Sequence, residues 1–347
     1  MRRALPLALL AAAVTVAVTA CSPADPAPTD SATAATSDGA FTLYSGRDEA
    51  LVQPLIDLFE EETGTDVEVR YGNTAELGAL LLEEGDQSPA QVFLSQDAGA
   101  LGALSNAGQF ATLPESITAA VPAGFTSTDD SWVGVTGRAR VIVYDGETLA
   151  ADEVPGSVDA FTDADWSGRF GIAPSNASFQ AFITAYRVLN GEDAADAWVS
   201  AIAANNPQIF ENNGALLAAV NEGVVEAGLL NHYYWFAQAA ETGAENMRAQ
   251  LSFPEEGDAG AIVNVSGAGL LKTGATDADA LAFIEFLVSA EAQQYFVDET
   301  FEYPLIEGVD APVGLPPLDS LVNPDLDLSD LESLEVTQEL LSQYGLI

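Results

Sequence analysis

Short apolar runs alternate with stretches of helical periodicity along most of the chain. Residues 41–46 form a strand-like run, and residues 48–62 carry apolar side chains at helical spacing until Gly64, which predicts a helix. The same patterns then predict a strand at 65–71, a helix at 74–84, a strand at 90–95 and a helix at 98–107. Strands that alternate with helices favour an α/β fold built on a mostly parallel sheet.

The alternation restarts near residue 139. Two strand-like runs, 131–135 and 138–144, are separated only by Thr136 and Gly137. Later patterns predict a strand at 170–174, helices at 178–189, 194–204 and 215–221, a strand at 225–230, an apolar run at 260–271 and helices at 277–287 and 290–297. A second α/β unit of this kind predicts two lobes with a ligand cleft between them, lined from the ends of strands.

The two-lobed interpretation divides the chain at the strand-like crossings. The crossings near 138–140 and 262–266 are expected to form a hinge that closes the lobes around a ligand. The predicted parts are an N-lobe at 41–138 that returns at 263–313, a C-lobe at 139–262 and a C-terminal helical segment at 314–347.

The N-terminus has the layout of a bacterial secretion signal. Two arginines and an apolar run lead to Val18-Thr19-Ala20-Cys21, so residues 1–20 are predicted to be cleaved. A small-residue box that ends on the only cysteine is similar to a lipoprotein processing site, at which Cys21 would be lipidated. An ordinary signal with an incidental cysteine is the alternative. Residues 21–40 are rich in Ser, Ala, Pro, Thr and Asp, so we expect a disordered tether and a lipid-anchored, extracytoplasmic protein.

The chain is strongly acidic, with a formal net charge of −43. Such a charge repels nucleic acid and anionic lipid, so neither is an expected partner. Lys272 is the only lysine. The acids are scattered along the chain, which favours a surface adapted to high salt over the attraction of a cationic ligand.

Several catalytic chemistries lack their residues. His232 is the only histidine and Cys21 is assigned to the anchor, so a triad could form only around His232 and no free thiol remains. Neither HExxH nor paired CxxC occurs. The glycine-rich segment 266–274 lacks the spacing of a phosphate-binding loop. Hydrolysis by paired carboxylates remains open, because any acid-rich chain offers such pairs.

Adjacent tyrosines follow the predicted strand at 225–230. A phenolate oxygen is a hard anionic donor, which a small and highly charged cation such as Fe³⁺ can hold deprotonated. Where a strand turns into a helix, the rings of Tyr233 and Tyr234 could converge on one point. Aromatic packing of the same two rings is an equally open interpretation.

Six separated segments carry a family resemblance in a consistent order. They are TLYSGRDE at 42–49, SPAQVFLSQDAGAL at 88–101, WVGVTGRARVIVYD at 132–145, PSNASF at 174–179, NHYYW at 231–235 and EYPL at 302–305. In these segments the chain resembles the ferric ion-binding proteins, two-lobed periplasmic-type receptors that deliver iron to ABC permeases. The resemblance implies a monomeric binding protein, not an enzyme, with Fe³⁺ as its cargo and an ABC permease as its partner.

The resemblance also implies the site residues. Tyr233 and Tyr234 match the tandem iron-ligating tyrosines, and Tyr144 matches a third tyrosine of some members. A synergistic anion, carbonate or phosphate, would be held by a helix N-terminus after PSNAS and by a bidentate arginine. The implied anion-binding residues are Thr136, Arg138, Asn176, Ala177, Ser178, Asn213 and Asn231.

Two positions depart from the family pattern. Asp48 stands where some members ligate iron with histidine, and Gln96 stands where they use glutamate. Both are possible ligands from the N-lobe, although Asp48 is at least as well explained as the N-cap of the following helix. His232, Arg140 and Trp235 are expected to be scaffold.

Other functions fit parts of the same pattern. A receptor of this fold for a phosphonate, a polyamine or thiamine would use the tyrosines only to line its cleft. A carboxylate-based surface hydrolase and an adhesion or scaffold module belong to different classes. A hydrolase needs a catalytic pair of carboxylates, and the sequence shows no clear one. An adhesion or scaffold module would have no use for an anion-binding loop opposite two adjacent tyrosines.

Overall fold

The computed structural model describes residue 37, residues 39–321 and residues 326–347. The predicted signal peptide, Cys21 and most of the predicted tether lie outside these residues. No helix in the described part of the chain combines the length and the apolar character needed to cross a bilayer.

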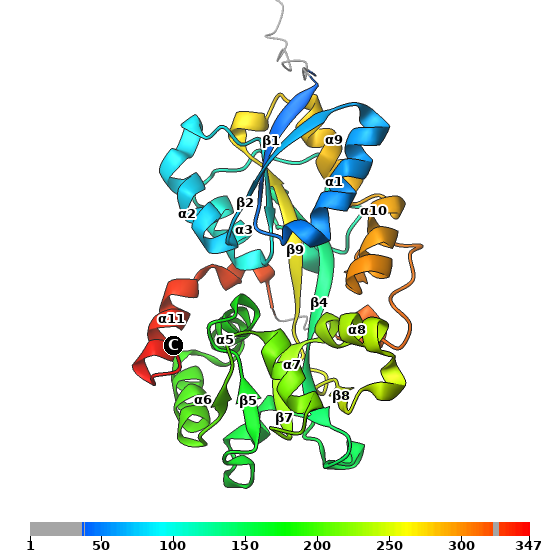
Figure 1. Cartoon of the computed structure of the whole chain (residues 1–347). Coiled ribbons are helices and arrows are strands. Elements are labelled where there is room, and N and C mark those ends of the chain that lie inside the picture. Colours follow the sequence, from blue (N-terminus) through cyan, green and yellow to red (C-terminus); the bar gives the residue numbers. More distant parts are fainter. Residues whose placement is uncertain (1–36, 38, 322–325) are drawn as a thin grey trace, which may run out of the picture. The chain divides into compact units, whose positions relative to one another are not determined.

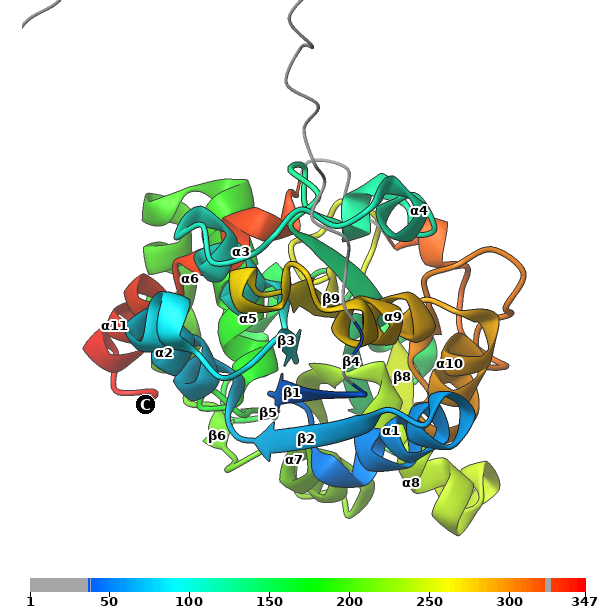
Figure 2. The same cartoon turned by 90° about the horizontal axis from the view of Figure 1, so that it is seen from above.

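The first lobe is built on a mixed sheet. Strands β1, β2 and β3 are parallel, and β9 runs antiparallel between β3 and β4. The strands are β1 (Ala40–Ser45), β2 (Asp66–Tyr71), β3 (Val92–Ser95), β4 (Trp132–Asp145), β9 (Val263–Leu270) and β10 (Tyr303–Pro304). The helices are α1 (Glu49–Thr63), α2 (Thr74–Glu84), α3 (Ala98–Asn106), α4 (Glu115–Thr118), α9 (Ala278–Leu287) and α10 (Ala290–Tyr295). Figure 2 shows α2 and α3 on one side of this sheet and α1, α9 and α10 on the other.

Helix α1 shows why the local patterns predicted these elements well. The side chain of Asp48 accepts a hydrogen bond from the Ala50 N–H and caps the first turn. Gly64 ends the helix with φ 75°, a conformation that glycine adopts without strain. The apolar side chains at helical spacing are buried, namely Val52, Leu55, Ile56 and Phe59.

The two strands predicted at 131–135 and 138–144 are one strand. The 14-residue strand β4 is buried throughout and crosses from one lobe to the other. Residues 132–139 pair with β9, whereas residues 140–145 pair with β7 and β8. Thr136 and Gly137 do not form a turn, because the register shift between Gly134 and Thr136 absorbs the irregularity without breaking the strand.

The second lobe is a smaller sheet around the second half of β4 (Figure 1). Its strands are β5 (Phe170–Ile172), β6 (Gln208–Ile209), β7 (Ala227–Asn231) and β8 (Ala249–Ser252). Its helices are α5 (Ala177–Asn190), α6 (Glu192–Ala204), α7 (Asn213–Asn221) and α8 (His232–Thr242). Strand β7 runs directly into α8, so the tyrosine pair lies at a strand end that turns into a helix, as the sequence predicted.

Side chains along β4 alternate between the two faces of this sheet. Val141 and Val143 join the core cluster that contains residues of α7, whereas Ile142 and Tyr144 join the cluster that contains the aromatic residues of α5. This period of two residues is the ordinary geometry of a strand. It also decides which face each polar side chain of β4 can reach.

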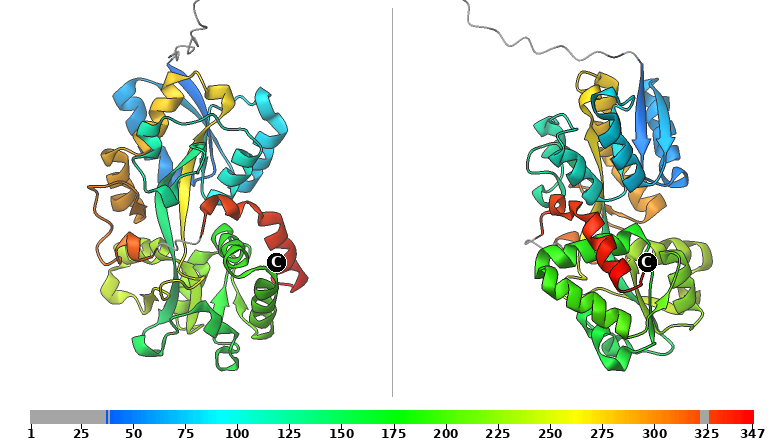
Figure 3. Two further views of the ribbon diagram at one scale, coloured as in Figure 1. Left: turned by 180° about the vertical axis from the view of Figure 1, so that it is seen from behind. Right: turned by 90° about the vertical axis from the view of Figure 1, so that its left-hand side faces the viewer.

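The C-terminal segment contacts both lobes. Residues 326–347, called the strap below, contain a 3₁₀ turn at Leu328–Glu332 and helix α11 at Leu334–Gln343. The turn packs on α3 and α11 packs on α5, as Figure 3 shows. A Cβ atom on Gly102 would lie 2.4 Å from the backbone O of Ser329, so the strap docks where α3 has no side chain.

We therefore predict that Gly102→Ala destabilises the protein. The added methyl group would displace the strap backbone, and overpacking of this kind lowers the free energy of unfolding by about 1–3 kcal/mol. Urea unfolding followed by circular dichroism measures the change.

Gly78→Ala in α2 is the matched control. Its Cβ would meet only the Ala100 Cβ, at 3.8 Å, an ordinary contact. Alanine is a better helix former than glycine, so this variant should be as stable as the unaltered protein or more stable by about 0.5–1 kcal/mol. Equal stability of the two variants would contradict the tight docking of the strap.

Candidate functional site

Tyr233 and Tyr234 lie in the first turn of α8, directly after β7 ends at Asn231. Their rings stack with centroids 4.4 Å apart and planes inclined by 27°. Burial raises the pKa of Tyr233 far above the usual value of a phenol, and Tyr234 raises it further, whereas Arg138 acts in the opposite direction. The Tyr233 phenol therefore stays protonated until a strong electrophile replaces the proton.

Three buried arginines surround the tyrosine pair. Arg138 and Arg140 lie on β4, paired with Asn264 of β9 and Asn231 of β7 respectively. Arg47 comes from the loop between β1 and α1, and its charge interacts with both phenols. The three side chains come from both lobes, so the cleft interior is positively charged although the chain as a whole is acidic.

Arg140 has no carboxylate partner among the described residues. It donates to the backbone O atoms of Ser178 and Leu229, at 3.3 and 3.1 Å, and its guanidinium lies over the rings of Phe179 and Phe182. Burial lowers the pKa of Arg140 to about 9, although Tyr234 acts in the opposite direction. Its Nε atom has no hydrogen-bond partner. An unpaired buried cation of this kind favours an anion beside it.

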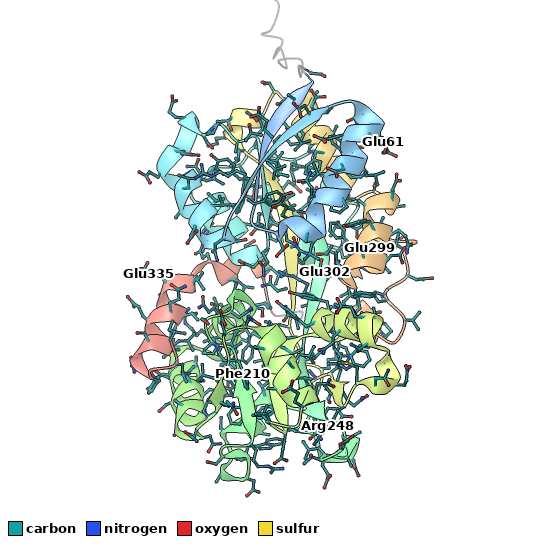
Figure 4. All side chains as sticks on the ribbon, in the orientation of Figure 1. Glu61, Phe210, Arg248, Glu299, Glu302 and Glu335 are labelled. Atoms are coloured by element: carbon teal, nitrogen blue, oxygen red, sulfur yellow. The ribbon has the colours of Figure 1, made fainter. Side chains whose placement is uncertain are left out.

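Glu302 is the buried carboxylate that holds the arginines in place. Arg47 donates to both carboxylate oxygens, at 3.0 and 3.1 Å, and the Thr136 hydroxyl donates at 2.8 Å. The Nε of Arg138 lies 4.0 Å from the same carboxylate. Burial alone would raise the pKa of Glu302, but Arg47 and Arg138 lower it below its usual value. Figure 4 shows Glu302 at the level where the chain crosses between the lobes.

The predicted anion loop forms the start of α5. Asn176 caps the helix by accepting from the Ser178 N–H at 3.0 Å and from the Ser178 hydroxyl at 2.7 Å. Asn213 donates to the Ser178 hydroxyl at 2.9 Å, and its own Oδ1 is buried without a partner. The first N–H groups of α5, including that of Ala177, therefore lie at the mouth of a polar site.

A small pocket brings most of these groups together. It receives residues from both lobes, from both crossing strands and from the start of α5. Its lining consists of Gln96, Asp97, Arg138, Arg140, Ala177, Ser178, Asn231, Ile262 and Asn264. We call it the anion pocket, because two guanidinium groups and a helix N-terminus converge there.

The N-lobe candidates Asp48 and Gln96 occupy different environments. The Asp48 side chain is exposed, and its carboxylate accepts a hydrogen bond from the Ala50 N–H. In this structure Asp48 therefore acts as the N-cap of α1. Gln96 follows β3 and lines the anion pocket, with its backbone N–H donating to the Thr74 hydroxyl at 3.0 Å. Of the two, Gln96 is the one that the structure brings to the pocket.

Tyr144 does not join the tyrosine pair. It pairs with Ala227 at the start of β7, whereas Arg140 pairs with Asn231 at its end. The difference of four residues along an extended strand is about 13 Å. Tyr144 packs in the hydrophobic core, so the structure does not bring the predicted third tyrosine to the pair.

Thr136, a predicted anion-binding residue, lies outside the lining of the anion pocket. Its hydroxyl is fully buried and donates to Glu302, and it does not line the anion pocket. It fixes the carboxylate that in turn holds Arg47. In the structure the contact that Thr136 makes is therefore a supporting one.

Sequence reasoning missed Arg47, Asp97, Asn264 and Glu302. Asp97 caps α3 by accepting from the Ala100 N–H at 3.2 Å; burial raises its pKa, and Arg138 opposes that shift. Arg47 and Glu302 stood inside two of the quoted segments, SGRDE and EYPL. Their ion pair joins positions 255 residues apart, so no local spacing could have paired them.

Comparisons with known proteins agree with this fold. The family model described as bacterial extracellular solute-binding protein matches residues 87–327. The chain is 34% identical over 317 residues to the "Fe(3+)-binding periplasmic protein" of Serratia marcescens, covering 91% of this chain and 93% of that protein. It is 32% identical over 351 residues to the "Major ferric iron-binding protein" of Neisseria gonorrhoeae, covering 100% of both.

Solved structures show the same architecture. Iron-bound HitA from Pseudomonas aeruginosa is 31% identical, with a TM-score of 0.82 over 88% of this chain and 99% of that one. A Trichodesmium protein in complex with iron and citrate is 30% identical, with a TM-score of 0.78 over 89% of this chain and 100% of that one. These similarities confirm the predicted two-lobed α/β fold.

His232 gives a prediction about stability and pH. The Ala139 N–H donates to its Nδ1 at 3.1 Å, and its Nε2–H donates to the backbone O of Phe301 at 2.8 Å, so the buried ring is neutral. Burial lowers the pKa of His232 from 6.5 to about 4. The unfolded chain therefore binds a proton at a higher pH than the folded chain does, and stability falls as the pH falls from about 6.5 towards about 4.

Because the chain has one histidine, this loss can be isolated. Between about pH 8 and about pH 5 the free energy of unfolding should fall by about 2 kcal/mol through His232. His232→Gln should be less stable at pH 8 but should lose this pH dependence, as urea unfolding at several pH values would show. An equally steep dependence in the variant would contradict the assignment.

Proposed function

The chain belongs to the bacterial extracellular solute-binding proteins, among those that bind ferric iron, and from this premise we propose that it captures Fe³⁺ through the Tyr233 and Tyr234 phenolates. An anion in the anion pocket would complete the binding site. The protein is a binder of the transport type, not an enzyme. Delivery of its cargo to an ABC permease, and anchoring through a lipid on Cys21, are parts of the same proposal.

The observation that carries the proposal is the stacked phenol pair among three buried arginines. A phenolate is costly in a buried site unless cations surround it, and Arg47, Arg138 and Arg140 supply that charge. Fe³⁺ is hard enough to displace both phenol protons, which leave to solvent as the metal binds. Two tyrosines that served only as packing would not need this charged surrounding.

The charge of the site supports an exogenous anion. The site contains three buried guanidinium groups against the carboxylates of Glu302 and Asp97, and Fe³⁺ brings more positive charge than two phenolates remove. The Nε atoms of Arg138 and Arg140 and the Oδ1 of Asn213 lack partners. Carbonate would suit two of these donors and the start of α5, since its oxygens can accept from guanidinium and backbone N–H groups.

Closure of the lobes would complete the site from both sides. Gln96 comes from the N-lobe and Ser178 from the C-lobe, and both line the anion pocket. Strand β4 pairs with β9 up to residue 139 and with β7 from residue 140. Because the two halves of the strand belong to different sheets, the hinge would lie at these two residues. A ligand that contacts both lobes would select the closed arrangement.

The first test is the colour of the iron complex. Iron-loaded protein should show a visible phenolate-to-iron charge-transfer band, and Tyr233→Phe and Tyr234→Phe should each remove or strongly weaken it. Tyr144→Phe is the matched control and should keep the band, since Tyr144 lies about 13 Å along β4 from the site. If Tyr144→Phe lost the charge-transfer band while Tyr233→Phe and Tyr234→Phe kept it, Tyr233 and Tyr234 would not be the iron ligands.

Native cargo separates this function from that of an organic-solute receptor. Protein purified without added metal should contain iron by elemental analysis. A colourless protein that carries an organic solute and refuses Fe³⁺ in the presence of bicarbonate would contradict the proposal.

The anion pocket gives a further prediction. Arg138→Gln should weaken iron retention in bicarbonate buffer by about tenfold to a hundredfold, the equivalent of losing a charge-assisted hydrogen bond. Competition with a coloured chelator measures the change. Arg169→Gln removes a partly exposed arginine that pairs with Glu226 outside the pocket, and it should leave retention unchanged.

A further inference from the structure

A second cavity opens beside the anion pocket. It has a volume of about 440 Å³ and lies between α2 and α3 of the N-lobe, α5 of the C-lobe and the strap. We call it the vestibule. Gln96, Asp97 and Ala177 line both the vestibule and the anion pocket, so one bound molecule could occupy both.

The vestibule is much larger than an inorganic anion requires. Cavities of about 300–1,000 Å³ hold organic ligands, whereas carbonate fills only a small part of such a volume. Its walls carry small side chains where α2 and α3 face the cavity, at Gly78, Ala79, Ala100 and Ala103. An organic ligand could therefore approach the helices closely.

The charge of the vestibule selects among iron chelators. Its lining contains no lysine or arginine, but it contains the carboxylates of Asp97, Glu332 and Glu335 and the amides of Gln180 and Gln338. Figure 4 shows Glu335 on the strap beside the gap between the lobes. The chain also carries a net charge of −43. Polycarboxylate and catecholate chelates of iron are anionic, so both the lining and the whole chain repel them.

The strap wall of the vestibule is built from fixed contacts. The Thr184 and Thr337 hydroxyls are 2.7 Å apart and buried, and Arg187 donates to the Ser333 backbone O and the Thr337 hydroxyl, at 2.9 Å each. On the other side, a Cβ on Gly99 would lie 2.5 Å from the backbone O of Leu331. The wall is therefore tied to both α5 and α3.

We propose that the exogenous ligand is an uncharged or cationic organic chelator of Fe³⁺, of the dihydroxamate class, whose carbon skeleton occupies the vestibule. This inference rests on the proposed function and names the ligand that shares the iron with Tyr233 and Tyr234. Two bidentate hydroxamates leave positions of an octahedral ferric ion open for two phenolates. Their hard anionic oxygens face the arginines, and the ferric dihydroxamate cation keeps a single positive charge that the acidic walls accept.

The experiment compares two forms of iron with the full-length protein. One is the ferric complex of a linear dihydroxamate that carries a terminal ammonium group and a carbon label. The other is ferric nitrilotriacetate with bicarbonate. After gel filtration the protein should retain the labelled dihydroxamate and iron in equal amounts. Iron retained without the label would overturn the inference and leave the proposed function standing.

Variants that fill the vestibule provide the second arm. Ala79→Phe and Ala103→Phe should weaken retention of the labelled chelate by about tenfold or more, since each phenyl ring would occupy volume that the carbon skeleton of the chelate needs. Both should load iron from nitrilotriacetate and bicarbonate as the unaltered protein does. Ala197→Phe, on an exposed position of α6 outside the vestibule, is the matched control.

The outcomes are distinguishable. Retention of the chelate that is unaffected by both filling variants would overturn the vestibule as its site. Failure of the unaltered protein to load iron from either source would refute the proposed function and this inference together. Loss of both forms of iron in the filling variants would also overturn the inference, because the vestibule would then not be separable from the anion pocket.

Discussion

The buried ion pair between Arg47 and Glu302 is the interaction on which the cleft depends. It joins the loop after β1 to the segment before β10, and the Thr136 hydroxyl ties the same carboxylate to β4. A pair that is 3% and 1% exposed is stable only when all its lone pairs and N–H groups are satisfied, because removal of one partner leaves an uncompensated charge. The pair therefore fixes Arg47 beside the phenols and, through Thr136, links β4 to the segment before β10.

Strand β4 imposes the second constraint. Its first half pairs with β9 and its second half with β7 and β8, so the strand passes from one sheet to the other at residues 139 and 140. At that point the Ala139 N–H donates to Nδ1 of His232. The Nε2–H of the same ring donates to the backbone O of Phe301, a bulky residue with φ 57°. Local strain of this kind persists only where surrounding contacts enforce it. The residue before the tyrosine pair is thus tied to the point at which β4 changes its strand partners.

The elements that the sequence predicted well are those with local causes. The bounds of α2 match the predicted range, and α1 begins at the Asp48 cap and ends at Gly64. The position of Tyr144 could not be predicted, because alternation gives the face of a strand but not its register against β7. The Arg47–Glu302 pair was also beyond reach, since tertiary contacts between distant segments leave no periodic signal. The juxtaposition of the two phenols at a strand end could be predicted, because adjacency in sequence is itself local.

The distribution of charge explains how so acidic a chain would hold the proposed anion. Surface carboxylates act through water and salt, which screen them over about 10 Å or less. Arg47, Arg138 and Arg140 act at contact distance in an interior of low dielectric, where the same charges interact several times more strongly. The chain has only 10 lysines and arginines, so three of them in one cleft are a marked concentration. The buried arginines therefore outweigh the screened surface carboxylates at the centre of the cleft.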